Sequence, residues 1–225
     1  ICAIFLFAGV VKGFLGIGLP AAAMGLLTLV IPPTEAISLL WLPILFTNIV
    51  QFGRAPERRS IATSYIWFAV PLAASIFLTS LFINDYPTAL LTVAIGSAMV
   101  IFSLNLLFGV TVPIGPGPVW QGAFGAVAGV LGGLSSIWSP PVAMYLIARD
   151  TPKERFIGAA GFLFLAGCVP LGIGLVMSGL VTWVVIVKSS LGLATTLIGF
   201  RVGEIMRERV SQHRFRQIVL VAFLL

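Results

Sequence analysis

Charged residues are scarce in this sequence. Of its 225 residues 9% are charged, with thirteen basic and seven acidic side chains, while 59% are hydrophobic. A soluble domain carries about 25% charged residues, so these few charges cannot cover a water-facing surface. The mean hydropathy of +1.13 and the long uncharged stretches instead predict an integral membrane protein. A cytosolic enzyme, a nucleic-acid-binding protein and a secreted disulfide scaffold are thereby excluded.

Cysteine and histidine are also rare. The two cysteines, Cys2 and Cys168, lie in apolar runs and are interpreted as membrane-embedded thiols, and the single histidine, His213, lies in a basic segment. This set predicts no metal site and no cofactor. An intramembrane hydrolase needs a nucleophile with a histidine base, or paired aspartates. Because neither histidine nor aspartate falls inside an apolar run, we expect no enzymatic activity.

The few carboxylates are absent from the middle of the apolar runs. Carriers coupled to protons or sodium usually place a carboxylate inside the membrane. We therefore expect transport that is not coupled through a buried carboxylate. The seven acids lie in loops or at the ends of runs: Glu35, Glu57, Asp85, Asp150, Glu154, Glu204 and Glu208.

Apolar runs divide the chain into predicted membrane segments. A spanning helix needs roughly 20 residues, and the runs are 1–30, 36–52, 61–83, 87–109, 119–148, 156–177 and 181–200, with a last one opening near 215. The first and fifth runs are longer and are interrupted by glycine, serine and proline, at 13–20 and 132–141. Non-helical backbone at membrane depth is tolerated only where protein buries it or where it lines a cavity. Both breaks are therefore candidates for a functional site.

The two breaks are also copies of each other. An offset of 120 residues aligns the halves without a gap and superposes shared glycines and prolines, which apolar bias alone does not explain. The chain is therefore interpreted as a tandem duplication. The identities include Ala8/Ala128, Gly9/Gly129, Val10/Val130, Gly13/Gly133, Ile17/Ile137, Pro20/Pro140, Ala23/Ala143, Met24/Met144, Leu26/Leu146 and Pro32/Pro152.

The distribution of basic residues indicates how the copies are oriented. If every run crosses once, the basic loops fall on both sides, against the positive-inside rule. If the two broken runs are re-entrant hairpins, the basic loops 53–60, 149–155 and 201–216 all face the cytoplasm. The prediction is an all-α integral membrane protein of one transmembrane domain, formed by two inverted repeats at 1–109 and 118–225. Each repeat has one broken re-entrant hairpin and three transmembrane helices.

The duplicated break resembles a known family. Its second copy reads Gly133-Leu134-Ser135-Ser136, then Pro140-Pro141 and Tyr145-Leu146, followed by the basic-aromatic stretch 153–156. These motifs, the duplication and the loop lengths are similar to the TauE/SafE sulfite exporter family. The resemblance implies a transporter, in a bacterial inner membrane, for small sulfur-containing anions such as sulfite or organosulfonates. The first copy departs from the family, because its glycines at 13, 16 and 18 are isolated where many relatives have a contiguous run.

The breaks themselves suit an anion. In each, the second half-helix begins near a proline, Pro20 or Pro140, a residue favoured in the first helical turn. Its free N–H groups and positive dipole end would face the midplane of the membrane. The small residues of the breaks let the backbone approach a ligand, and the serines add hydroxyl donors; alternatively they only allow close helix packing. These residues are Gly13, Gly16, Gly18, Gly133, Ser135, Ser136 and Ser139.

Four further polar residues are candidates for the substrate site. Lys12 lies in an apolar run one residue before the first break, where a base is costly and points to function; it could instead snorkel or neutralise a helix end. Asn48 and Gln51 lie about one turn apart and either face the cavity or join helices. Tyr145 either donates its phenol O–H or belongs to an aromatic belt.

These observations predict a membrane transporter, an exporter, that binds a small sulfur-containing anion at the midplane and is driven at least partly by the membrane potential. Its expected partners are the anion and the lipid bilayer, with no nucleic acid, and a homo-oligomer is left open. The alternatives are a channel or carrier for another small solute, and a membrane scaffold or assembly factor without transport.

Overall fold

The computed structural model describes residues 1–108, 115 and 117–210, without the side chains of 98, 99 and 101–108. Within this part the chain forms ten α-helices and no strand, as the apolar composition predicts. The predicted run from 215 and the basic residues beyond 210 lie outside the described residues.

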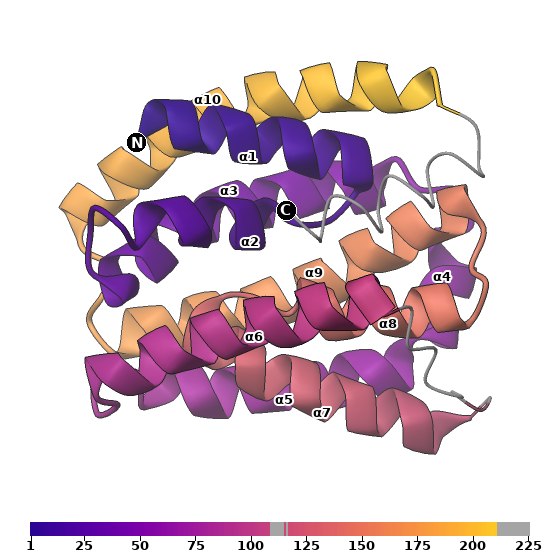
Figure 1. Ribbon diagram of the computed structural model, residues 1–225, viewed down its shortest axis with the longest axis horizontal. Coiled ribbons are helices and arrows are strands. Elements are labelled where there is room, and N and C mark those ends of the chain that lie inside the picture. Colours follow the sequence, from indigo (N-terminus) through magenta and orange to yellow (C-terminus); the bar gives the residue numbers. More distant parts are fainter. Residues whose placement is uncertain (109–114, 116, 211–225) are drawn as a thin grey trace.

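The helices run back and forth between two ends of the molecule (Figure 1). In chain order they are α1 (Cys2–Leu15), α2 (Leu19–Leu27), α3 (Pro33–Gly53), α4 (Arg58–Ser64), α5 (Ile66–Leu81), α6 (Thr88–Phe108), α7 (Pro118–Ser135), α8 (Ser139–Ala148), α9 (Lys153–Met177) and α10 (Trp183–Glu208). In Figure 1, α2 returns toward the end at which α1 begins, and α8 returns toward the other end, at which α7 begins.

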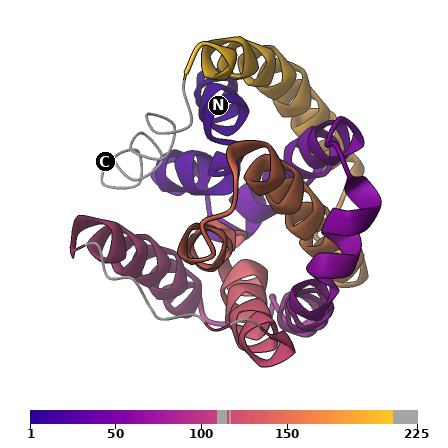
Figure 2. The same ribbon diagram turned by 90° about the vertical axis from the view of Figure 1, so that its right-hand side faces the viewer.

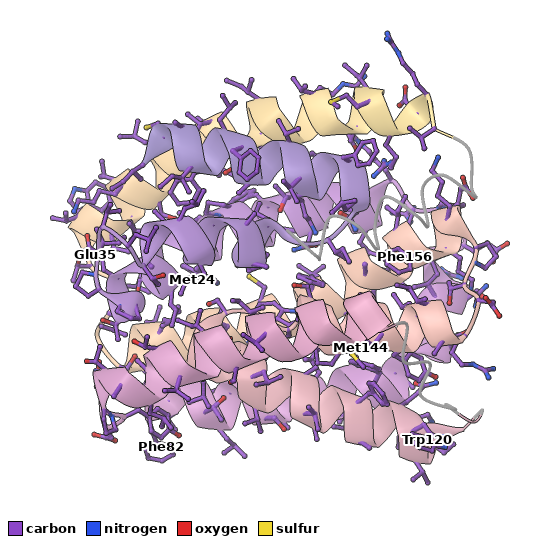
Figure 3. All side chains as sticks on the ribbon, viewed as in Figure 1. Met24, Glu35, Phe82, Trp120, Met144 and Phe156 are labelled. Carbon is purple, nitrogen blue, oxygen red and sulfur yellow. The ribbon has the colours of Figure 1, made fainter. Side chains whose placement is uncertain are left out.

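Basic residues gather at one end of the bundle, which we call the basic end. In Figure 1 it is the end that holds α4, the start of α9 and the finish of α10. Glu35 and Phe82 lie at the opposite end, where the segments 28–32 and 82–87 also lie (Figure 3). The described residues that define the basic end are Arg54, Arg58, Arg59, Arg149, Lys153, Arg155, Arg201, Arg207 and Arg209.

Several helices can cross a membrane. By length and composition, α3, α9 and α10 qualify in the described part, and α4 with α5 makes a fourth if the bent pair is one span. Large apolar side chains such as Leu191 and Ile198 of α10 and Leu78 of α5 are exposed, as contact with lipid tails requires.

Two details of the predicted segments are wrong. The run 61–83 is not one straight span, because α4 and α5 meet at an angle of 69°; the bend lets Ile61 bury against Gly158 of α9. The predicted basic loops are also partly helical. Arg201 and Arg207 lie in the last turns of α10, and Lys153 is the first residue of α9, since a helix continues past its apolar part while its polar end reaches water.

Glycines hold two helix pairs in close contact. Gly9 and Gly13 of α1 face Gly199 and Gly203 of α10, so closely that a Cβ at Gly199 would collide with the Leu6 carbonyl oxygen. The glycines of α7 meet the backbone of α5 in the same manner. Figure 2, which views the bundle from the basic end, shows α1 beside α10. Small residues are the usual means by which membrane helices approach so closely.

We expect Gly199→Val to destabilise the protein by about 1–3 kcal/mol, because the added atoms overpack the α1–α10 contact. Thermal unfolding of the detergent-purified protein measures this effect. Gly122→Ala is the matched control, because nothing lies within 4 Å of its added Cβ. Equal melting temperatures for the two variants would contradict the proposed packing.

Candidate functional site

The first break is a short left-handed turn between α1 and α2. Gly16 has φ 77° and Gly18 has φ 92°, values that residues with a Cβ rarely adopt. Pro20 lies in the first turn of α2, as predicted. The two isolated glycines are therefore needed for the turn itself.

Lys12 is buried beside this turn. Only 1% of the residue is exposed, and its Nζ donates to Asn48 Oδ1 at 2.6 Å and to the Gly16 carbonyl oxygen at 3.2 Å. Asn48 Nδ2 donates to the Ile44 carbonyl at 2.7 Å, which turns Oδ1 toward the ammonium. The ammonium also lies over the Phe164 ring, 4.8 Å from its centroid.

The charge of Lys12 is not balanced by an acid. None of the ion pairs formed by the described residues includes Lys12. Amide, carbonyl and aromatic groups stabilise the ammonium by hydrogen bonds and cation–π attraction, but they carry no negative charge. A buried charge is ordinarily paired, so this arrangement departs from the usual one.

Gln51 ties the first break to the second half of the chain. Its Nε2 donates to the Gly16 carbonyl at 2.9 Å and to the Ile157 carbonyl of α9 at 2.7 Å. Gly16 therefore receives bonds from both Lys12 and Gln51. Asn48 and Gln51 both contact residues at the first break, and their hydrogen bonds join α3 to α1 and α9. Their role in a substrate site stays a prediction.

A cavity of about 350 Å³ lies at the basic end and reaches Gln51. Its wall includes Glu204, which is 6% exposed and forms ion pairs with Arg54 at 2.9 Å, Arg201 at 3.4 Å and Arg207 at 3.8 Å. Arg207 also donates to the Gly13 carbonyl at 2.9 Å. The lining residues are Gln51, Arg54, Ala55, Pro56, Lys153, Glu154, Ile157, Gly158, Glu204, Arg207 and Glu208.

The second break lies between α7 and α8. The Ser135 hydroxyl donates to the Leu131 carbonyl at 2.6 Å and accepts the Ile137 N–H at 3.0 Å, so its hydrogen bonds are made within the turn. Ser136 has φ 58°, a left-handed conformation that costs a residue with a Cβ roughly 1–2 kcal/mol. Ser139 begins α8.

Three donors at the second break have no partner among the described residues. They are the hydroxyls of Ser136 and Ser139 and the indole N–H of Trp138, all fully buried. Phe164 packs on Trp138 with 5.2 Å between ring centroids and also carries the Lys12 ammonium. The Phe164 ring thus contacts Lys12 beside the first break and Trp138 in the second break, 120 residues further along the sequence.

The two helix N-termini predicted to form an anion cradle differ in their backbone donors. At α2, the N–H groups of Leu19 and Ala21 lie in the first turn, where no intrahelical acceptor exists. At α8, Pro140 and its neighbour Pro141 have no N–H at all, which removes two of the first-turn donors. The unpaired donors near this turn are the two serine hydroxyls and the Trp138 indole.

Three predicted residues lie in packing contacts. Gly13 meets the backbone of α10, and Gly133 meets Thr79 of α5. Tyr145 is 3% exposed and packs edge-on against Tyr65 and Phe68, within an aromatic cluster. It therefore lies inside the bundle, and its role in the substrate site stays a prediction.

Sequence reasoning missed Trp138 and Phe164. Trp138 lies inside the predicted break, but a tryptophan in a membrane protein is ordinarily an interface anchor, so the sequence does not single it out; Trp67 and Trp183, by contrast, are exposed. Phe164 carries no polar atom and lies in an unbroken apolar run, so no pattern marks it. Lys188, a second base within an apolar run, is half exposed and pairs with Glu35 at 3.0 Å.

Long apolar helices, two broken helix pairs and a lone buried base define a multi-pass helical membrane protein with an internal polar site. The chain belongs to the TauE/SafE sulfite exporter family, whose model matches residues 1–225. This match confirms the resemblance seen in the duplicated break. No significant match was found among curated proteins or among solved structures.

We expect Asn48→Leu to destabilise the protein by about 1–3 kcal/mol, because it removes the shortest hydrogen bond of a buried ammonium. Lys12→Met in the same chain should recover much of this loss, since no charge is then left without its acceptor. Chemical unfolding of the two single variants and the double variant measures the coupling. Strictly additive losses would show that Lys12 does not depend on Asn48.

Proposed function

We propose that this protein exports small sulfur-containing anions, such as sulfite or organosulfonates, across the bacterial inner membrane. The family is named for sulfite export, and the observation that carries the proposal is the buried Lys12 ammonium without a carboxylate partner. An anion bound beside it would supply the missing negative charge. A carrier for a neutral solute has no use for such a charge.

An inverted-repeat architecture is part of the proposal. The 120-residue offset pairs α1 with α7, α2 with α8, α3 with α9 and α5 with α10. Packing supports this pairing, because α1 contacts α10 while its counterpart α7 contacts α5, and α3 contacts α9. The opposite directions of the two broken pairs in Figure 1 agree with an inverted arrangement. The repeats are 1–109 and 118–225.

The orientation follows from the basic end. Cytoplasmic segments of membrane proteins carry an excess of lysine and arginine, so the basic end would face the cytoplasm. The cavity at this end would then admit the anion from the cytoplasm. Gln51, which closes the cavity toward Gly16 and Lys12, would separate the entrance from the binding site.

The anion would bind between the breaks. Lys12 provides the charge, the first turn of α2 provides backbone N–H groups with a positive dipole end, and Ser136 and Ser139 provide hydroxyls. Gly16 and Gly18 allow the backbone to come close, while Gly13, Gly133 and Ser135 hold the helices and the turn. In this proposal, fewer residues bind the anion than the two motifs contain.

The membrane potential would drive export. A negative interior favours outward movement of an anion by about 2.3 kcal/mol per charge per 100 mV. The only deeply buried carboxylate among the described residues, Glu204, lies near the end of α10 and is paired with arginines, so it does not resemble a proton relay. No coupling ion is required.

In proteoliposomes, we expect sulfite or methanesulfonate flux to increase when a potential negative on the loaded side is imposed, because the anion moves down its electrical gradient. A potassium gradient with valinomycin sets the potential, and radiolabelled substrate reports the flux. Flux that ignores the potential but follows an imposed pH gradient would overturn the proposed driving force.

We expect Lys12→Met to lower this flux at least tenfold while the protein remains folded, since a desolvated ion pair to the anion is lost. Lys188→Met is the matched control, because Lys188 is half exposed and pairs with Glu35 at the opposite end. Both variants are checked by size-exclusion chromatography before reconstitution. Equal flux in the two variants would exclude Lys12 from the anion path.

A further inference from the structure

The second break contains more unpaired donors than a buried turn ordinarily tolerates. Ser136 Oγ, Trp138 Nε1 and Ser139 Oγ lie within four consecutive residues, and none has an acceptor among the described residues. All three residues are 0% exposed. Buried polar groups in native proteins are nearly always hydrogen-bonded, so a cluster of three exceptions points to an acceptor other than the described residues, as a bound ligand would supply.

Comparison of the repeats shows that the turn does not need the Ser136 side chain. Ser136 corresponds to Gly16 at the 120-residue offset, and both are left-handed, with φ 58° and 77°. Glycine adopts this conformation without strain, whereas serine does not. The second break therefore keeps a strained serine where the first shows that glycine suffices, and its hydroxyl has no structural bond.

The repeats also differ at two further aligned positions. At the 120-residue offset, Trp138 corresponds to Gly18, and Lys12 corresponds to Gly132. A Cβ at Gly132 would lie only 2.8 Å from Cε3 of Trp138, so the indole fills the space beside the position equivalent to Lys12. One half of the site thus holds a cation and the other a neutral aromatic donor, and Phe164 contacts both.

We propose that Trp138 Nε1 and the hydroxyls of Ser136 and Ser139 bind the three oxygens of one –SO₃ group that carries a single negative charge, with Lys12 as its counter-charge. This inference rests on the proposed function and specifies its substrate class. The three donors are neutral, so the site supplies one positive charge in total. The Phe164 and Trp138 rings provide an apolar wall for the rest of a sulfonate.

The charge and donor count set the selectivity. Sulfate would bring a second negative charge. The other described base that reaches the breaks, Arg207 at the Gly13 carbonyl, already pairs with Glu204, and an unbalanced buried charge is strongly unfavourable. Acetate has only two oxygens, which lie in one plane, so one oxygen would have to accept from two of the three donors, a poorer match than one oxygen for each donor. Methanesulfonate, with three oxygens and one charge, satisfies all three donors.

The affinity of the purified full chain for methanesulfonate, sulfate and acetate, measured by ligand-dependent thermal shift in detergent, tests this inference. We expect methanesulfonate to bind at least about tenfold more tightly than the other two, and Trp138→Phe to weaken it by about tenfold or more through loss of one hydrogen bond to an anion. The matched control is Trp41→Phe, because the Trp41 indole already donates to the Cys168 carbonyl at 3.1 Å.

Ser136→Gly separates binding from folding. Because it removes a strained residue and an unpaired hydroxyl, we expect the ligand-free protein to melt at the same or a higher temperature while methanesulfonate affinity falls several-fold. A lower melting temperature with unchanged affinity would show that Ser136 is structural and would overturn its assignment.

The outcomes for the two proposals are distinct. If the unmodified protein binds neither methanesulfonate nor sulfite, the proposed function itself fails. If it binds them, but sulfate binds equally well or Trp138→Phe and Trp41→Phe have equal affinity, the proposed function stands and the assignment of the three donors is wrong.

Discussion

The structure depends on a buried ammonium that has hydrogen-bond acceptors but no counter-charge. Lys12 reaches Asn48 and Gly16 at the first break, and Gln51 joins the same carbonyl to α9. The ammonium is contacted by the Gly16 carbonyl of the left-handed turn, by the Asn48 amide oxygen and by the Phe164 ring. A charge held in this manner in an apolar bundle is costly, and its retention is best explained by a ligand of opposite sign.

The scaffold around the site keeps the breaks close together. Glycines let α1 press against α10 and α7 against α5, so each broken pair is held by a long helix of the other half. Arg207 fixes the end of α1 through the Gly13 carbonyl and pairs with Glu204, which Arg54 of α3 also contacts. A movement of α10 would therefore displace residues both at the first break and in the wall of the cavity.

Sequence reasoning reached the breaks because glycine and proline determine local backbone geometry, and it singled out Lys12 because a lone base in an apolar run is conspicuous. It could not pair Lys12 with Asn48, since contacts across 36 residues depend on how helices pack. Trp138 and Phe164 were missed because their residue types carry no clear signal. An indole in a membrane protein is ordinarily an interface anchor, and a phenylalanine has no polar group. The bend between α4 and α5 was missed because neither glycine nor proline marks Tyr65, where the two helices meet.

The central claim is that one anion lies between Lys12 and the second break. An experimental density map of the protein with methanesulfonate, compared with a map without it, tests this claim most directly. The account predicts new density that contacts Lys12 Nζ on one side and Trp138 Nε1 with the Ser136 and Ser139 hydroxyls on the other. Density confined to the cavity beside Arg54, or no difference at saturating methanesulfonate, would contradict it.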